Sequence, residues 1–244
     1  MSEFEPFYDT ISLKQNALKR MEDITYIPQL TLQLFGFDLV FNTYTILMTW
    51  VVMAALIIFA FLATRKIAFV PNLFQVVGEM IVSTFYGLTR DALDDELAKK
   101  YFPVICSLFM FLVLSNWLGT FPKLEEPTKD LNTPLGLGLM GFFIAHYAGI
   151  KAKGFKKYAK EYCEPMFFMA PLNIIGELSK VVSISFRLYG NMVGGAIIIL
   201  VVSHLIYSLI LPPFLMCFFN LFIGTIQAFV FTMLTLVYIS VQVK

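Results

Sequence analysis

The chain has 244 residues, of which 58% are hydrophobic and 14% are charged, and its mean hydropathy is +0.75. Soluble domains carry roughly 25% charged residues, so this composition excludes an ordinary soluble fold. The formal net charge of +1 excludes a bulk electrostatic attraction for nucleic acid. We therefore expect an all-α integral membrane protein, with an external or interfacial segment at residues 1–43 and a single helical membrane domain at 44–244.

The first apolar run is preceded by an irregular segment and followed by an amphipathic one. Residues 24–43 alternate irregularly between apolar and polar, which fits an interfacial strand, a short helix or a loop. Tyr44–Thr64 carries no charge and stops at two basic residues, as a membrane-spanning helix does. In Asn72–Thr89 apolar residues recur at mixed helical spacing, which predicts an amphipathic helix on the membrane surface.

Two more spans and their loops predict the orientation of the chain. They lie at about Tyr101–Phe121 and Thr133–Ile150. The loop after the latter carries lysines at 151, 153, 156, 157 and 160, whereas the loop between the two spans is mixed in charge. Because basic residues favour the cytoplasmic side, we expect the N-terminus outside and, after five crossings, the C-terminus in the cytoplasm.

The last two apolar stretches are unusually long. They run from Pro165 to about Leu211 and from Phe214 to Val243. A perpendicular crossing takes about 20 residues, so the first stretch is roughly twice as long as needed. Either both helices tilt strongly, or the chain breaks, for which Gly190, Gly194 and Gly195 are the candidates.

Arg187 is the only Asp, Glu, Lys or Arg between Val181 and Val243. Its guanidinium stays protonated in essentially any protein environment, so it cannot escape the membrane interior by losing its charge. The nearest carboxylate, Glu177, lies off the same helical face and about 15 Å away along the helix. The pattern predicts that the counter-charge of Arg187 comes from another subunit.

Polar and small residues accompany Arg187 on both long helices. One stripe, spaced by four, consists of Ser179, Ser183, Arg187 and Asn191, and the final helix offers Asn220, Gly224 and Gln227 on one face. This pattern predicts a polar groove between closely packed helices. The alternative is a packing seam whose arginine extends to the headgroups.

The segment around Arg187 resembles the signature of subunit a of F-type ATP synthases, in which a central arginine is followed by Leu, an aromatic residue, Gly and Asn. Further similar blocks lie in the same order along the chain, at Leu62–Lys66, Pro127–Leu135, Pro171–Ile175 and Ile226–Ser240. The resemblance implies a non-catalytic, ion-translocating stator subunit without a cofactor, beside a rotating ring of c subunits that each carry one carboxylate. It also implies subunit b of the peripheral stalk and the F1 head as partners, and two half-channels that pass H⁺ or Na⁺ to the ring.

The resemblance implies functional roles residue by residue. Ion translocation is expected to involve Arg187, Asn191, Gln227, Asn220 and Ser183, and the half-channels to be lined by Ser179, Glu79, His204 and Asp130. Many members place a titratable pair where this chain has Ala196 and Asn220, so the usual proton relay is absent there. Na⁺ therefore stays an alternative to H⁺ as the coupling ion.

Two other classes of function are weaker. A secondary transporter for an anionic solute would use Arg187 as a clamp, but no internal repeat is evident. A membrane enzyme lacks any nucleophile or metal-ligand motif at membrane depth. A short N-terminus without a transit-like pattern favours a bacterial plasma membrane.

Overall fold

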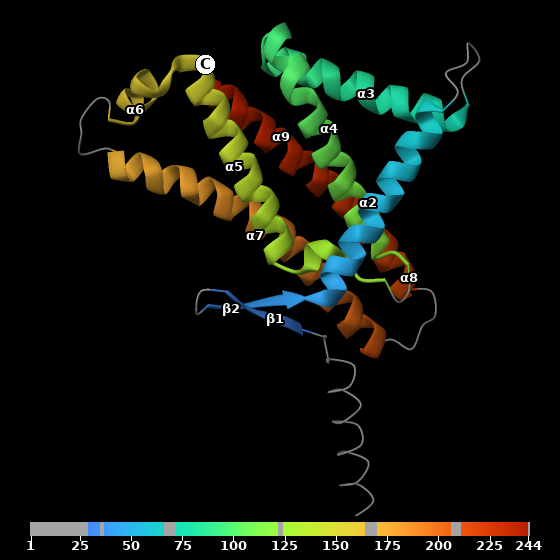
Figure 1. The fold of residues 1–244 in the computed structure, drawn as a ribbon. Helices are drawn as coiled ribbons and strands as arrows, with labels where there is room; N and C mark the ends of the chain where they lie inside the picture. The colour runs from blue at the N-terminus through green and yellow to red at the C-terminus, as the bar shows by residue number, and fades with distance from the viewer. Residues whose placement is uncertain are drawn as a thin grey trace, which may run out of the picture. The chain divides into compact units, whose positions relative to one another are not determined.

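The computed structural model describes residues 29–34, 37–65, 72–121, 124–163, 170–205 and 211–243, and Figure 1 shows their elements. The chain divides into two compact units, Met1–Leu47 and Met48–Lys244. In the first unit, strands β1 (Gln29–Leu34) and β2 (Phe37–Asn42) pair as an antiparallel hairpin. Of the three alternatives for residues 24–43, the strand is therefore confirmed at 29–34 and 37–42, whereas residues 24–28 and 35–36 lie outside the described residues. The predicted domain boundary at 43/44 stays a prediction.

Five helical segments of the described chain are long and apolar enough to cross a membrane, which confirms the predicted number of crossings. They are α2 (Thr43–Thr64), α4 (Asp95–Leu118), α5 (Asn132–Lys153), α7 (Ala170–Leu205) and a last helix at 211–243. The last helix comprises α8 (Leu211–Met216), a π-helical segment η3 (Cys217–Ile223) and α9 (Gly224–Val243). The predicted amphipathic helix is α3 (Leu73–Ala92), which is not among the five spans.

The two last helices are longer than a perpendicular crossing needs, as predicted, and the suggested break is absent. α7 contains 36 residues, which at 1.5 Å per residue is about 54 Å, against a hydrocarbon thickness of about 30 Å. It runs without interruption through its glycines, so a break at Gly190–Gly195 is wrong. A strong tilt therefore stays the predicted way to accommodate the excess length. Pro212 and Pro213 lie in the first turn of α8, where a missing backbone N–H is tolerated.

The lysine-rich loop and the mixed loop also contain helical structure. The first connects α5 to α6 (Phe155–Cys163) through Gly154 alone, whose φ of 83° is one that glycine adopts without strain. Our expectation of a plain loop there is therefore wrong. The mixed loop folds into a short 3-10 helix, η1 (Pro127–Lys129), which packs against α4, α5 and α7.

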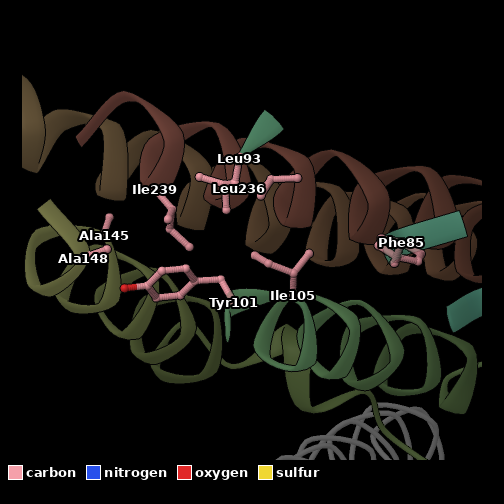
Figure 2. Packing of buried hydrophobic residues seen from close by; sticks show 8 residues of the cluster. All are labelled: Phe85, Leu93, Tyr101, Ile105, Ala145, Ala148, Leu236 and Ile239. Atoms are coloured by element: carbon pink, nitrogen blue, oxygen red, sulfur yellow. The ribbon is translucent and has the colours of Figure 1, made fainter. Parts of the chain in front are cut away.

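Apolar side chains from four helices form one core of the second unit. Figure 2 shows this cluster, in which the small residues of α5 let its neighbours approach closely; its members are Phe85, Leu93, Tyr101, Ile105, Ala145, Ala148, Leu236 and Ile239. A second cluster joins α4, α7 and α9 and contains Leu108, Leu112, Val113, Ile184, Leu188, Met192, Ala228 and Phe231. The second cluster positions α7 against α9, and the groove between them stays a prediction.

Candidate functional site

The predicted polar stripe of α7 lies on the outer face of the helix. Ile184, Leu188 and Met192 recur at spacings of four and point into the core. Ser179, Ser183, Arg187 and Asn191 are all exposed on the chain. Around them lie exposed apolar side chains, among them Val182, Phe186 and Ile198. This face therefore combines a permanent cation with a surface suited to lipid or to another membrane protein.

Arg187 makes no ion pair with any carboxylate in the described part of the chain. Glu177 Oε1 instead lies 2.6 Å from Lys180 Nζ, one turn along α7. The sequence-based argument that Glu177 does not neutralise Arg187 is thus confirmed. Among the described residues, the guanidinium therefore has no carboxylate that neutralises it.

The glycines near Arg187 have two different roles. A Cβ on Gly195 would lie 2.9 Å from the Phe219 ring, so this glycine allows η3 to pack closely on α7. A Cβ on Gly190 or Gly194 would meet nothing within 4 Å. These two share the outward face with Arg187 and keep it free of bulk.

A hydrogen bond joins the two predicted stripes. Asn191 Nδ2 donates to Gln227 Oε1 at 2.9 Å, although the residues are 36 positions apart. Gln227 is 4% exposed, and its Nε2 has no hydrogen-bond partner among the described residues. The pair therefore connects the outer face of α7 to the buried face of α9 and leaves one amide donor unused.

A buried polar contact that the sequence did not reveal ties α4 to α9. Asn116 Nδ2 donates to the Gly224 carbonyl oxygen at 2.8 Å, and Asn116 Oδ1 accepts from Thr128 Oγ1 at 2.8 Å. Asn220, one of the residues predicted to take part in ion translocation, lies in η3 four positions before Gly224, and its side chain is buried. The only available signal was a single Asn near the end of an apolar span.

Glu126 is a second residue that sequence reasoning missed. It precedes η1, is 3% exposed, and has two carboxyl oxygens without hydrogen-bond partners. Lys129 Nζ lies 3.5 Å from Glu126 Oε1. Burial raises the pKa of Glu126 to about 7, and the neighbouring Lys129 only partly opposes this rise.

The remaining predicted residues do not gather around Arg187. Glu79 on α3 accepts from Gln75 Nε2 at 2.8 Å and lines a largely apolar cavity of about 500 Å³ between α2, α3 and α4. Asp130 follows η1, and its Oδ1 accepts from the Asn132 backbone at 3.1 Å. His204 belongs to the last turn of α7, but its side chain lies outside the described residues.

A polar cleft of about 330 Å³ lies where the start of α7 meets the end of α9. Its lining includes Lys153, Asn173, Glu177, Lys180 and Gln242. Lys180 also sits over the Tyr238 ring, 5.6 Å from its centroid. The stripe of α7 thus runs from this charged cleft toward the end of the unit that holds Asn116 and Glu126.

Comparison with known proteins gives one consistent result. A family model described as "ATP synthase A chain" matches residues 46–240. "ATP synthase subunit a" of Moorella thermoacetica is 36% identical over 196 residues, covering 80% of this chain and 88% of that protein. "ATP synthase subunit a 2" of a Bradyrhizobium species is 36% identical over 210 residues, covering 86% and 93% respectively. "ATP synthase subunit a" of Helicobacter pylori is 38% identical over 183 residues, covering 73% and 80%.

Proposed function

The chain belongs to the ATP synthase A chain family, and on that basis we propose that it carries H⁺ through two half-channels to and from the carboxylates of a rotating ring. As a family member it is a non-catalytic, ion-translocating subunit of the membrane sector Fo, which assembles with the ring and with other subunits of the synthase. This assignment removes the alternatives of a secondary transporter and a membrane enzyme.

The exposed and unpaired guanidinium of Arg187 is the observation that carries the proposal. Within the described chain it lacks a carboxylate, and apolar side chains surround it on the outer face of α7. A cation in such a place needs a counter-charge, which a carboxylate on each passing ring subunit supplies. The positive charge lowers the pKa of that carboxylate and so releases its proton. It also repels a proton moving directly from one half-channel to the other.

Two polar regions, which we place at opposite ends of the groove, support two separate half-channels through which the ion reaches the ring. The cleft at Lys153, Glu177 and Lys180 serves one side, and the Asn116–Thr128 contact marks the other. Because lysines cluster at the cleft end, we place that end in the cytoplasm, with the N-terminus outside and the C-terminus inside. We further propose a bacterial inner membrane as the location, because the chain has five candidate spans and its relatives are bacterial proteins.

H⁺ is the proposed ion because the groove offers amides and hydroxyls that water can bridge. Asn191 and Gln227 are already hydrogen-bonded to each other, and no carboxylate stands beside them in the described residues. A Na⁺ ion needs several oxygen ligands in its coordination shell, whereas a proton moves between hydrogen-bonded groups. We further propose subunit b and, through the complex, the F1 head as partners of this chain.

Substitution of Arg187 tests the function directly. In membrane vesicles that contain the assembled synthase, Arg187→Ala should abolish ATP-driven ion pumping, and ATP hydrolysis by the detached F1 head should be unchanged. Arg187→Lys should be severely impaired, because lysine is able to lose its proton and lacks the planar fork. Arg90→Ala is the matched control, since Arg90 is an exposed cation on α3 that pairs with Asp95 away from the groove.

Coupled pumping by both Arg187 variants, at the level of Arg90→Ala and of the unaltered protein, would contradict the proposal. Equal assembly of all variants is checked by the amount of ring subunit that co-purifies with each.

A further inference from the structure

A buried carboxyl group outside the membrane spans has no assigned role. Glu126 lies between α4 and α5, and its side chain is fully shielded from solvent in the chain. No described group donates a well-aligned hydrogen bond to either carboxyl oxygen, and the nearest cation, Lys129 Nζ, lies 3.5 Å from Oε1. A buried carboxylate without hydrogen bonds is costly, so the protein retains here a group that changes charge easily.

The local structure holds this carboxyl against the end of α4. A Cβ on Gly119 would overlap the Glu126 carboxyl group, so only glycine allows the carboxyl to rest on the backbone there. The position of Glu126 is further fixed by the next residue, because Pro127 begins η1 and is itself buried. Glu126 is thus placed by the fold and is not a surface acid that happens to bend inward.

Two charged groups act on Glu126, and both belong to its own segment. Lys129 favours the carboxylate and Glu125 disfavours it, and burial outweighs both, so that the pKa rises to about 7. The adjoining ends of α4 and α5 contribute uncharged residues. α7 also packs against η1, but none of its described charged side chains pairs with Glu126.

The Glu126 carboxyl rests on Gly119, one turn beyond Asn116, and polar contacts run from Asn116 toward Arg187. Thr128, two residues after Glu126, donates to Asn116, which in turn donates to the carbonyl of Gly224. Gly224 lies one turn before Gln227 on α9, and Gln227 accepts from Asn191. Asn191 is one turn, about 6 Å, beyond Arg187 on α7. None of the amides and hydroxyls in these contacts titrates near neutral pH.

We propose that Glu126 is the residue that exchanges protons in the outer half-channel of this subunit. It supplies the titrating group that the neighbouring amides and hydroxyls lack. The inference rests on the proposed function and names the residue that serves one of its two half-channels. In the loading direction the carboxylate takes a proton from a hydronium ion of the outer phase and leaves water. The neutral acid then passes that proton to water in the groove and becomes a carboxylate again.

The test compares Glu126→Gln with Glu125→Gln in proteoliposomes that hold the complete synthase. Glu125 is the matched control because it is the exposed neighbour of Glu126 and carries the same charge. ATP synthesis is measured at constant total driving force while the pH of the outer-facing compartment varies from 6 to 8. Glu126→Gln should synthesise ATP at under a tenth of the wild-type rate and lose the inflection near pH 7. Glu125→Gln should keep the wild-type rate and the inflection, moved only slightly to lower pH because Glu125 is the smallest of the influences on the pKa of Glu126.

Glu126→Asp separates an exchange role from a structural one. It keeps a carboxyl group, so it should restore most of the rate with a shifted pH profile. Wild-type rate and pH profile in Glu126→Gln would overturn the inference. If Arg187→Ala stops transport in the same preparation, the proposed function still stands. If neither variant affects transport, both proposals fail.

Thermal unfolding of the subunit in the purified complex gives a second readout. Because the pKa of Glu126 is higher in the folded state than in the unfolded chain, its neutral form is favoured by folding. The stability that this provides is complete below about pH 4.5 and is lost as the pH rises through about 7. Glu126→Gln should therefore be more heat-stable than wild type at pH 8, and a lower unfolding temperature there would overturn the inference.

Discussion

At the scale of single residues, the site depends on amide side chains that donate and accept at the same time. Asn116 is fully buried, and each end of its amide has one partner from a different part of the chain. Gln227 and Asn191 form the corresponding pair between α7 and α9. Amides can hold a buried polar track in a fixed geometry without carrying charge, which suits a path along which protons move.

Asn116→Asp is the sharpest test of that geometry because it replaces only the NH₂ group of the amide by an oxygen atom. The Asp side chain is unable to donate to the Gly224 carbonyl, and two oxygen atoms then face each other in a buried site. We expect a loss of about 2 kcal/mol or more of unfolding free energy. Thr128→Val, which removes one hydroxyl, should cost about 1 kcal/mol. The measurement is the unfolding temperature in detergent, and an Asp variant as stable as wild type would contradict the assigned hydrogen bonds.

The chemistry of Arg187 was predictable from the sequence, whereas the positions of Asn116 and Glu126 were not. A guanidinium cannot become neutral, so its lack of a nearby carboxylate could be read from spacing alone. The partners Asn116 and Gly224 are 108 residues apart, and no local pattern encodes their contact. Glu126 is one of two adjacent acids in a mixed loop, and only the tertiary fold distinguishes the buried one from the exposed one.

At the scale of elements, α7 is a helix with two very different long faces. Its buried face packs on α5 and α9, and the helix is continuous through Gly190, Gly194 and Gly195. Each glycine costs roughly 1 kcal/mol in helix propensity, which tertiary contacts exceed. For this reason a break was a reasonable expectation from the sequence and is nevertheless wrong.

Gly195 and Gly190 form a matched pair for testing the two faces of α7. Gly195→Ala places a methyl group against the Phe219 ring and should lower unfolding free energy by about 1–3 kcal/mol. Gly190→Ala meets nothing within 4 Å, so the stability of the purified subunit should stay the same or rise slightly. In the assembled synthase, however, Gly190→Ala should reduce ion pumping, because we propose that this face of α7 meets the ring. Equal unfolding temperatures for the two variants would contradict the packing of α7 on η3.

The existence of the membrane-spanning helices could be predicted from the length of the apolar runs, but their local departures from α-helical geometry could not. The five spans were predictable because each presents a long apolar run. The π-helical segment η3 was not, since Cys217–Ile223 reads as ordinary apolar helix and the widened turn arises where it packs on Gly195. Likewise α6 is a lysine-rich helix of only 9 residues, which length and charge suggested to be loop.

At the scale of the whole molecule, many apolar side chains of the described residues are exposed. Only 11% of the spanning window of α2 is buried, and the last helix exposes Phe214, Phe218, Phe222 and Phe229 in addition to the outer face of α7. Such a surface fits lipid and neighbouring membrane helices. The complete synthase is therefore the unit in which the ion should be identified.

The coupling ion is expected to be H⁺. ATP hydrolysis by the intact complex should not be stimulated by Na⁺, and Na⁺ should not protect the ring carboxylate from a carbodiimide, because a proton-coupled site binds no Na⁺. Potassium at the same ionic strength is the control for general salt effects. Stimulation together with protection at millimolar Na⁺ would identify sodium as the ion and contradict the proposal.

The bare cation on the outer face of α7 also bears on how the complex is built. A chain inserted alone must expose Arg187 to acyl chains or drag water and headgroups toward it, at a cost of several kcal/mol. That cost disappears once an acidic partner faces the guanidinium, so assembly with such a partner stabilises this chain in the membrane.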